Sequence, residues 1–142
     1  MGMNTIEELK ERVILIGVST SDGDDTEESL KELKELADTA GAETVGTVIQ
    51  NREAVHPGTY IGKGKIEEVR AMAFGLNATG VICDDELSPA QLNNLEQELD
   101  LKVMDRTLII LDIFAAHART SEGKIQVELA QLRYRSTRLI GM

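Results

Sequence analysis

The chain of 142 residues has one cysteine, no tryptophan and only 3% aromatic residues. A single cysteine, Cys83, excludes an internal disulfide, and with two histidines beside it the usual structural zinc site cannot be assembled. So few aromatic rings exclude the base-stacking platforms of single-strand-binding proteins. No apolar run approaches the roughly 18 residues that span a bilayer, and no signal segment opens the chain. We therefore expect a cytoplasmic protein that holds no metal and contacts no membrane.

What the chain does have is an ordinary globular composition with an uneven distribution of charge. Hydrophobic residues make up 42% and charged residues 28%, which is typical of a soluble protein with a packed core. The net charge is −10, but residues 1–50 hold 12 acidic and 4 basic residues, residues 51–100 hold 9 and 4, and residues 101–142 hold 4 and 7. This asymmetry favours polyanion contact through the C-terminal end alone, or else it reflects an uneven solvated surface.

Short apolar runs alternate with amphipathic segments along the first hundred residues. Four of these runs are predicted to be strands, at residues 13–18, 43–51, 80–83 and 101–104. The first run is nearly continuous, which is typical of a strand buried on both faces of a parallel sheet. The β-α-β-α-β-α-β alternation predicts an α/β fold, namely a four-stranded, mostly parallel sheet with flanking helices in a Rossmann-like, three-layer arrangement.

Capping residues mark the ends of the predicted helices. Ser88 and Gln91 form a strong helix start, with Ser at the cap and Gln in the box position. Asp25 with Glu28 indicates a similar box before the helix that follows the first strand. Gly41 stands where that helix is expected to end in a left-handed residue.

The last third of the chain has a different character. We predict an apolar helix over residues 108–118, a break at 120–123, and then a long helix. The apolar residues of the long helix recur at nearly heptad spacing: Ile125, Leu129, Leu132 and Leu139. Such a half-finished stripe needs a partner. We divide the chain into an α/β domain, residues 1–106, and a helical arm, residues 107–142, which we expect to be one arm of a truncated hairpin that can self-associate through its exposed helix.

Gly62, Lys63, Gly64 and Lys65 open the predicted helix after the second strand. A helix N-terminus presents unpaired amide donors and a partial positive charge, and here two ammonium groups and two glycines let the backbone approach an anion. These four residues are candidates for binding a phosphate of a nucleotide or of RNA. The alternative is a tight turn with two solvated lysines, because the G-x-x-x-x-G-K-[ST] spacing of a P-loop does not occur in the sequence.

Acidic residues follow three of the predicted strands, at the edge where open α/β sheets place their sites. They are Asp22, Asp24 and Asp25 after the first strand, Asp84, Asp85 and Glu86 after the third, and Asp105 after the fourth. Such carboxylates could hold a hard cation such as magnesium, but we assign no metal ligand among them. The order D-x-D-x-T from Asp22 also resembles a haloacid-dehalogenase-type phosphatase with an aspartate nucleophile, although helix capping explains the same aspartates.

Basic residues dominate the long C-terminal helix and the segment before it. Five cations stand against two glutamates, Glu122 and Glu128. These cations are Arg119, Lys124, Arg133, Arg135 and Arg138. Such a surface could neutralise several RNA phosphates, with each contact adding salt-dependent affinity. A solvated helix face is the alternative interpretation.

Several blocks of the sequence resemble, in order, the N-terminal region of the HflX family of ribosome-associated GTPases. They are residues 59–65 (TYIGKGK), 84–89 (DDELSP), 105–107 (DRT), 111–115 (LDIFA) and 122–132 (EGKIQVELAQL). The resemblance runs from about Arg12 to Gly141. It implies an N-terminal α/β domain, a helical hairpin that reaches ribosomal RNA, and a GTPase domain with GTP and magnesium that is absent from this sequence.

The resemblance also implies a partner, the large ribosomal subunit with its RNA and proteins, and a role in splitting stalled or idle ribosomes under stress. We therefore expect the chain to dock on the ribosome through the basic arm and the Gly62–Lys65 turn. Without a P-loop, it should have no catalytic residue and no cofactor of its own, and so should not be an enzyme. The alternative is a stand-alone nucleotide- or phosphate-binding α/β module of the haloacid-dehalogenase-like phosphatase kind.

Overall fold

The computed structural model describes residues 10–21, 24–118 and 121–140, apart from the side chains of residues 121 and 136–140. Its elements follow in the order β1 (Arg12–Ser19), α2 (Thr26–Thr39), β2 (Glu43–Asn51), α3 (Lys63–Leu76), β3 (Gly80–Cys83), α4 (Pro89–Leu99), β4 (Lys102–Asp105), α5 (Arg106–His117) and α6 (Ser121–Ile140). All four predicted strands are present, the last shifted by one residue. The alternation of strands and helices is as predicted.

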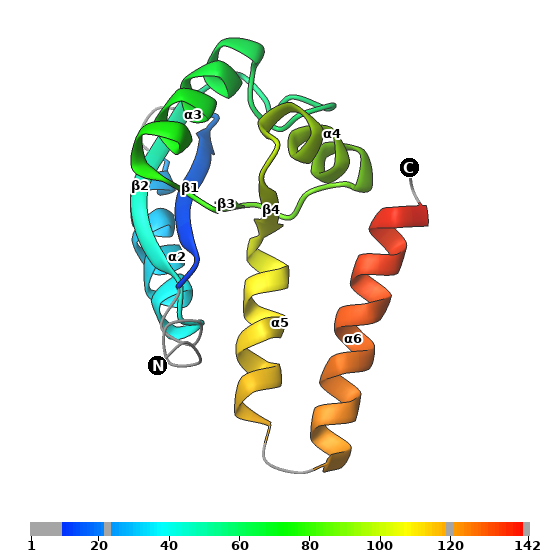
Figure 1. Ribbon diagram of the computed structural model, residues 1–142. Coiled ribbons are helices and arrows are strands. Elements are labelled where there is room, and N and C mark those ends of the chain that lie inside the picture. Colours follow the sequence, from blue (N-terminus) through cyan, green and yellow to red (C-terminus); the bar gives the residue numbers. More distant parts are fainter. Residues whose placement is uncertain (1–9, 22–23, 119–120, 141–142) are drawn as a thin grey trace.

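The four strands form one parallel sheet in the order β2-β1-β3-β4 (Figure 1). β1 lies in the interior of the sheet and pairs with β2 along its whole length and with β3 over its first half. Residues 13–18 of β1 are all buried, because both of their faces are covered. The prediction of an α/β fold is confirmed, and every strand pair is parallel.

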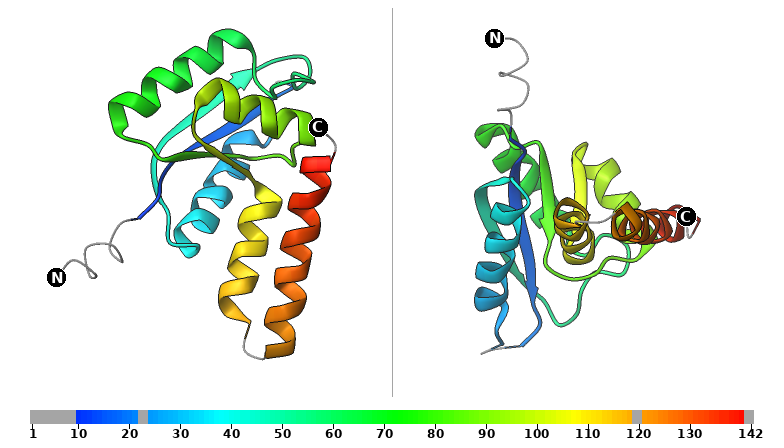
Figure 2. Two further views of the ribbon diagram at one scale, coloured as in Figure 1. Left: turned by 45° about the vertical axis from the view of Figure 1, so that its right-hand side comes forward. Right: turned by 90° about the horizontal axis from the view of Figure 1, so that it is seen from below.

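Helices cover both faces of the sheet, which gives the three layers that the alternation predicts (Figure 2). On one face, α3 and α4 bury Val69 and Leu95 in a core shared with β1 and β3. On the other face, α2 and α5 bury Leu33 and Leu108 in a second core. Successive side chains of a strand point to opposite faces, so β1 contributes to both cores. Because all four strands are parallel, their carboxyl ends meet at one edge of the sheet, where α3, α4 and α5 begin.

The predicted caps are confirmed at one helix and corrected at another. Ser88 Oγ accepts from the Gln91 amide at 3.1 Å, and Gln91 Oε1 accepts from the Ser88 amide at 2.9 Å, which completes the capping box of α4. The box predicted for α2 is wrong, because the Asp25 backbone is not extended as a capping residue requires, and its side chain makes no cap hydrogen bond. Asp24 Oδ1 instead accepts from the Thr26 amide at 3.3 Å and from the Thr26 hydroxyl at 2.8 Å.

α5 and α6 lie side by side as a helical hairpin that projects from the sheet (Figures 1 and 2). α5 begins at Arg106, directly after β4, and its first turn buries Leu108 and Ile109 in the core. α6 returns along α5 and also contacts α4. Within the described residues, α5 is therefore the helical neighbour of the long helix.

The two sides of α6 have different surroundings. Tyr134 packs against the core that α2 and α5 share. Ile125, Leu129 and Leu132 are 57%, 45% and 60% exposed, so the stripe predicted from the sequence stays open to solvent in the described part of the chain. The side chain of Leu139 lies outside the described residues. None of the helices described here is long and apolar enough to cross a bilayer.

Candidate nucleic-acid interface

The Gly62–Lys65 turn forms the start of α3, as predicted, at the carboxyl edge of the sheet. Gly62 is the N-cap and, having no side chain, makes no side-chain cap hydrogen bond. The Gly62 amide donates to Gln50 Oε1 at 2.8 Å, which ties the turn to the end of β2. A Cβ at Gly62 would lie 2.7 Å from Arg52 Nη1, so the guanidinium of Arg52 lies directly against the turn. Three cations, Arg52, Lys63 and Lys65, therefore surround the amino end of α3.

Not all of that positive charge is available to an anion. Lys65 Nζ forms an ion pair with Glu68 Oε2 at 2.6 Å. Lys63 and Gly64 are exposed, and a Cβ at Gly64 would meet no atom within 4 Å. An anion can thus approach the backbone at Gly64, where the helix dipole and Lys63 favour it.

The loop that leads into the turn is held by its own hydrogen bonds. His56 and Tyr60 exchange two backbone hydrogen bonds of 3.0 and 2.9 Å, and Gln91 Nε2 donates to the His56 carbonyl at 2.9 Å. Tyr60 is buried with φ of 67°, and its hydroxyl donates to Asp85 Oδ2 at 2.6 Å. Burial raises the pKa of the Tyr60 phenol, so the group stays a hydrogen-bond donor. A bulky residue in the left-handed region is uncommon, and here the surrounding contacts hold it in place.

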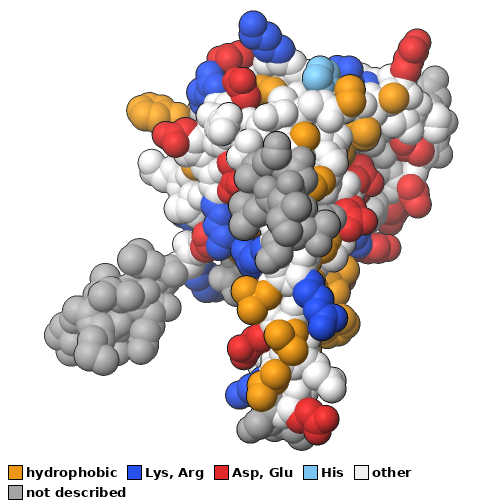
Figure 3. Space-filling view, turned by 90° about the vertical axis from the view of Figure 1, so that its right-hand side faces the viewer, with side chains coloured by type: hydrophobic (Ala, Val, Ile, Leu, Met, Phe, Trp, Pro, Cys, Tyr) orange, Lys and Arg blue, Asp and Glu red, His pale blue; other side chains and the backbone are white. Residues whose placement is uncertain are grey.

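The structure describes three of the five basic side chains predicted for the arm. Lys124 and Arg133 are exposed on α6, and Arg135 Nη2 lies 3.7 Å from Asp112 Oδ1 of α5. Arg119 and the side chain of Arg138 lie outside the described residues. In Figure 3, Asp and Glu side chains gather over the α/β body, whereas basic, acidic and hydrophobic side chains alternate along the projecting hairpin.

The turn and the arm do not form one cluster. The turn begins α3 on one face of the sheet, whereas the arm belongs to the hairpin beside β4 (Figure 1). The first turns of α6 lie at the far tip of the hairpin from the start of α3. Any ligand that touches both must be large, as a folded RNA is.

The acidic residues at the carboxyl edge are mostly engaged in structural contacts. Asp24 accepts from Ser19, Thr20 and Thr26, and the Thr26 hydroxyl above all holds the pKa of Asp24 below its usual value. Asp84 Oδ1 accepts from Arg106 Nη2 at 2.7 Å. Asp22, the nucleophile of the phosphatase alternative, lies outside the described residues. Among the described residues no group of three or more His, Cys, Asp or Glu side chains could hold a metal.

Cys83 lies at the end of β3 and is fully buried. Burial raises the pKa of the Cys83 thiol well above its ordinary value, so the thiolate needed for nucleophilic attack is disfavoured. The side chain is a small core residue, as its place in an apolar strand predicts.

Asp105 is a buried structural residue at the junction of β4 and α5. It is the N-cap of α5, and its two oxygens accept from the Leu108 amide at 3.0 Å, from the Leu87 amide at 2.9 Å and from the Tyr134 hydroxyl. An Asp three residues before the first buried residue of a helix is a recognisable cap signal. The partner Tyr134 has no such signal, because it is 29 residues away in sequence.

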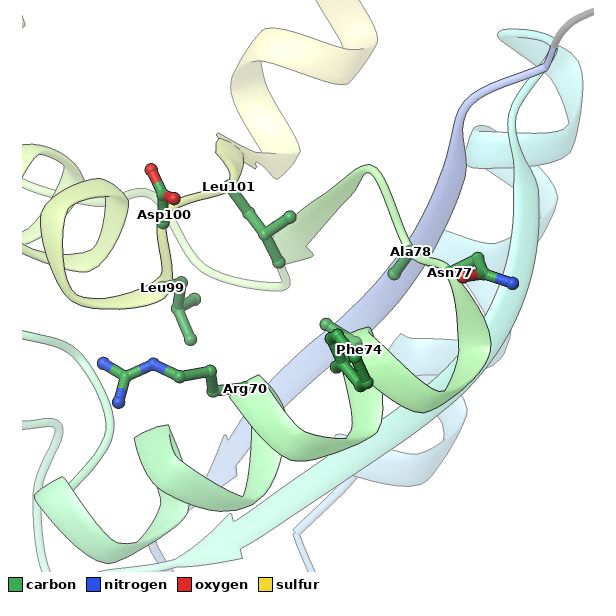
Figure 4. Close-up of a pocket in the computed structure, with 8 residues that line it drawn as sticks. Arg70, Phe74, Asn77, Ala78, Leu99, Asp100 and Leu101 are labelled. Carbon is green, nitrogen blue, oxygen red and sulfur yellow. The ribbon is translucent and has the colours of Figure 1, made fainter.

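A hollow of about 380 Å³ lies between α3 and the end of α4, at the opposite edge of the sheet (Figure 4). Arg70 and Phe74 line it from α3, Leu99 lines it from the last turn of α4, and Leu101 lines it from the connection to β4. Phe74 is 89% exposed. The one cation at the rim, Arg70, is already hydrogen-bonded to Glu67 at 3.0 Å, so the hollow is not arranged for an anion.

Two family models match the chain. One is described as "GTP-binding GTPase N-terminal" and matches residues 27–115, and the other as "GTP-binding GTPase Middle Region" and matches residues 117–142. The GTPase HflX of Lacrimispora saccharolytica is 66% identical over 137 residues, which cover 96% of this chain and 32% of that protein. The GTPase HflX of Escherichia coli is 43% identical over 130 residues, which cover 92% of this chain and 30% of that protein. This chain therefore spans about a third of the length of these curated relatives.

Solved structures agree with the fold. A crystal structure of SsGBP in complex with GDP gives a TM-score of 0.74 at 24% identity and covers 93% of this chain and 37% of that one. A GTP-binding protein from the hyperthermophilic archaeon Sulfolobus solfataricus, also with GDP, gives a TM-score of 0.70 at 24% identity, over 91% of this chain and 38% of that one. By the family models and the curated relatives, this chain belongs to the HflX family of GTPases and corresponds to its N-terminal region.

Proposed function

We propose that this chain is the ribosome-docking region of an HflX-type GTPase that acts in the cytoplasm, associates with the large ribosomal subunit and takes part in splitting ribosomes under stress. The observation that carries the proposal is the position of two cations. Lys124 and Arg133 are exposed on a hairpin that projects from an acidic α/β body. Because the body repels phosphate and the hairpin cations attract it, RNA contact through α6 is favoured.

The Gly62–Lys65 turn is the second contact in this proposal. It offers an uncapped helix N-terminus together with Lys63 and the guanidinium of Arg52. Glu68 offsets part of its charge through the ion pair with Lys65, and the surrounding body is acidic. The turn should therefore add less affinity than the arm.

We further propose that GTP and magnesium are bound by a GTPase domain of the whole protein and not by this chain. A P-loop cradles phosphates with consecutive backbone amides and a lysine, and the spacing that forms one does not occur in this sequence. Isothermal titration calorimetry of the 142-residue chain with GTP should give no saturable heat. Saturable binding would contradict the proposal that GTP is bound outside this chain.

The docking proposal is tested by two matched double variants in a chain extended by the GTPase domain. Lys124→Ala with Arg133→Ala removes two cations from the arm, and Lys63→Ala with Lys65→Ala removes two from the turn. The arm variant should weaken binding to purified large ribosomal subunits more than the turn variant does. It should also flatten the plot of log affinity against log salt by about one unit per lost phosphate contact.

The result decides whether the arm or the Gly62–Lys65 turn is the main docking surface. If the turn variant proves the more damaging and the arm variant is neutral, the arm is not the docking surface and the Gly62–Lys65 turn becomes the functional site. If neither variant changes affinity or salt dependence, the proposal that this region contacts RNA is wrong.

A further inference from the structure

One buried carboxylate joins the α/β body to the hairpin. Asp105 is 1% exposed, and both of its oxygens are used. Oδ1 accepts from the Leu108 amide at 3.0 Å, and Oδ2 accepts from the Leu87 amide at 2.9 Å and from the Tyr134 hydroxyl. The end of β4, the connection before α4, the start of α5 and the helix α6 therefore share a single acceptor group.

The contact with Tyr134 is also where α6 meets the core. The Tyr134 ring packs against the core cluster that β1, α2 and α5 form. About one turn earlier, Gln131 Nε2 donates to Asp112 Oδ1 of α5 at 2.6 Å. Residues three apart lie on the same face of a helix, so these two hydrogen bonds fix the rotation of α6 about its own axis.

That rotation decides where the arm cations point. Arg133 and Arg135 flank Tyr134 in the sequence, and each is turned by about 100° around the helix from it. With Tyr134 held inward, Arg133 is exposed and Arg135 lies within 3.7 Å of Asp112. A rotated or tilted α6 would direct both guanidinium groups elsewhere.

We propose that Asp105 and Tyr134 form a positioning joint, which holds α6 in one orientation relative to the α/β body and so presents the arm cations to RNA. The part that concerns RNA rests on the proposed function. The orientation itself is a property of the chain alone, and the two parts are tested separately.

The orientation is tested without any RNA. Spin labels are attached to cysteines introduced at Glu35 of α2 and Glu122 near the hairpin tip, two exposed positions; Cys83 is buried and should not react. Tyr134→Phe removes the hydroxyl and keeps the ring. The distance distribution between the labels should become about twofold broader, because the hairpin samples more orientations when a charge-assisted hydrogen bond is lost.

Tyr60→Phe is the matched control. It also removes one tyrosine hydroxyl that donates to an aspartate, but that aspartate is Asp85 and not the Asp105 that binds α6. This variant should leave the label distances unchanged. An unchanged distribution in Tyr134→Phe, or equal broadening in both variants, would overturn the joint. So would a loss of helical circular dichroism across the whole Tyr134→Phe chain, since the residue would then support the entire fold and not the arm.

Binding to large ribosomal subunits distinguishes a loss of arm orientation from a loss of positive charge. In the chain extended by the GTPase domain, Tyr134→Phe should weaken large-subunit binding about three- to tenfold while leaving the salt slope as it was, because no cation is removed. A lower slope would mean that the number of phosphate contacts had changed, and would contradict pure positioning. Broadened distances with unchanged binding would uphold the orientation and overturn its link to RNA. The proposal that the arm binds RNA would still be tested separately, by the Lys124→Ala and Arg133→Ala double variant.

Discussion

Leucines in the α/β body and on α6 have opposite surroundings. Leu33 of α2 and Leu95 of α4 are completely buried, whereas Leu129 and Leu132 of α6 are about half exposed. The body is closed around its own two cores, and α6 is held through one face only. Regular apolar spacing therefore predicted helices in both regions; it also marked the covered face in the body, as in α2, but not on α6, where the apolar stripe is exposed.

The Arg and Lys side chains of the α/β body and of α6 also differ in their surroundings. In the body, Arg106 pairs with the buried Asp84 at 2.7 Å, and Arg12 forms an exposed ion pair with Glu43 at 3.0 Å. On α6, Arg135 Nη2 lies 3.7 Å from Asp112 Oδ1 of α5, with both side chains partly exposed. Exposed pairs of this kind contribute little to stability. The body thus holds Arg106 in an ion pair with a buried carboxylate, whereas Lys124 and Arg133 of the hairpin are exposed.

The largest expected difference compares the same substitution in the two regions. Leu33→Ala should lower the free energy of unfolding by about 3 kcal/mol, because it opens a cavity in a closed core. Leu129→Ala should cost less than about 1 kcal/mol, since the side chain is already half in solvent. Urea denaturation followed by circular dichroism measures both. Equal losses would mean that α6 is covered in solution and that the contrast between the regions is wrong.

Most of the fold could be predicted from the sequence because local signals and the global arrangement agree. The buried run at residues 13–18, the Ser88–Gln91 box and Gly41, with its φ of +88°, each appear as expected. The Asp25 box failed because Asp24, one residue earlier, satisfies the helix start through a network with Ser19 and Thr26 that spacing alone does not reveal.

The second prediction concerns the place where the body and the hairpin meet. Arg106, the first residue of α5, donates to Asp84 Oδ1 at 2.7 Å and to the Ser29 carbonyl at 2.9 Å. Arg106→Ala should destabilise the chain by about 2 kcal/mol, because it leaves the carboxylate of Asp84 buried without its ion pair. Lys31→Ala, which breaks an exposed pair with Glu28, serves as the control and should cost less than about 1 kcal/mol. If both variants lose a similar free energy of unfolding, Arg106 contributes no more to stability than an exposed charge does, and the prediction is wrong.

The candidate site was less predictable than the fold. Residues 62–65 were found because a glycine-lysine turn at a helix start is a local signal. Arg52, which lies against Gly62, was missed because the contact depends on how β2 and α3 meet. Tyr134 was missed because its partner Asp105 is distant in sequence and its own position faces away from the apolar stripe.

The third prediction asks whether a second copy covers the open stripe. We expect weak self-association through Ile125, Leu129 and Leu132, because an exposed apolar stripe gains free energy when another surface covers it. Leu132→Lys should weaken the association at least about tenfold in sedimentation equilibrium, since a buried ammonium opposes it. Phe74→Lys changes an equally apolar but separate surface and should have no effect on it. A chain that stays monomeric at high concentration would show that the stripe has no affinity for its own copy.

The smallest effect concerns a loop of the body that is ordered by its own hydrogen bonds. The Thr26 hydroxyl holds the pKa of Asp24 below its usual value, so the ionised form supports the start of α2 at neutral pH, and that support is lost as the pH falls through the lowered pKa. Thr26→Val keeps the shape and removes the hydroxyl; the pKa of Asp24, followed by NMR of its carboxyl carbon, should rise towards the ordinary value. Thr39→Val, at the other end of α2, should leave it unchanged. If the pKa of Asp24 does not move in Thr26→Val, the Asp24 network does not fix this loop, and the body is less rigid at its carboxyl edge than its contacts indicate.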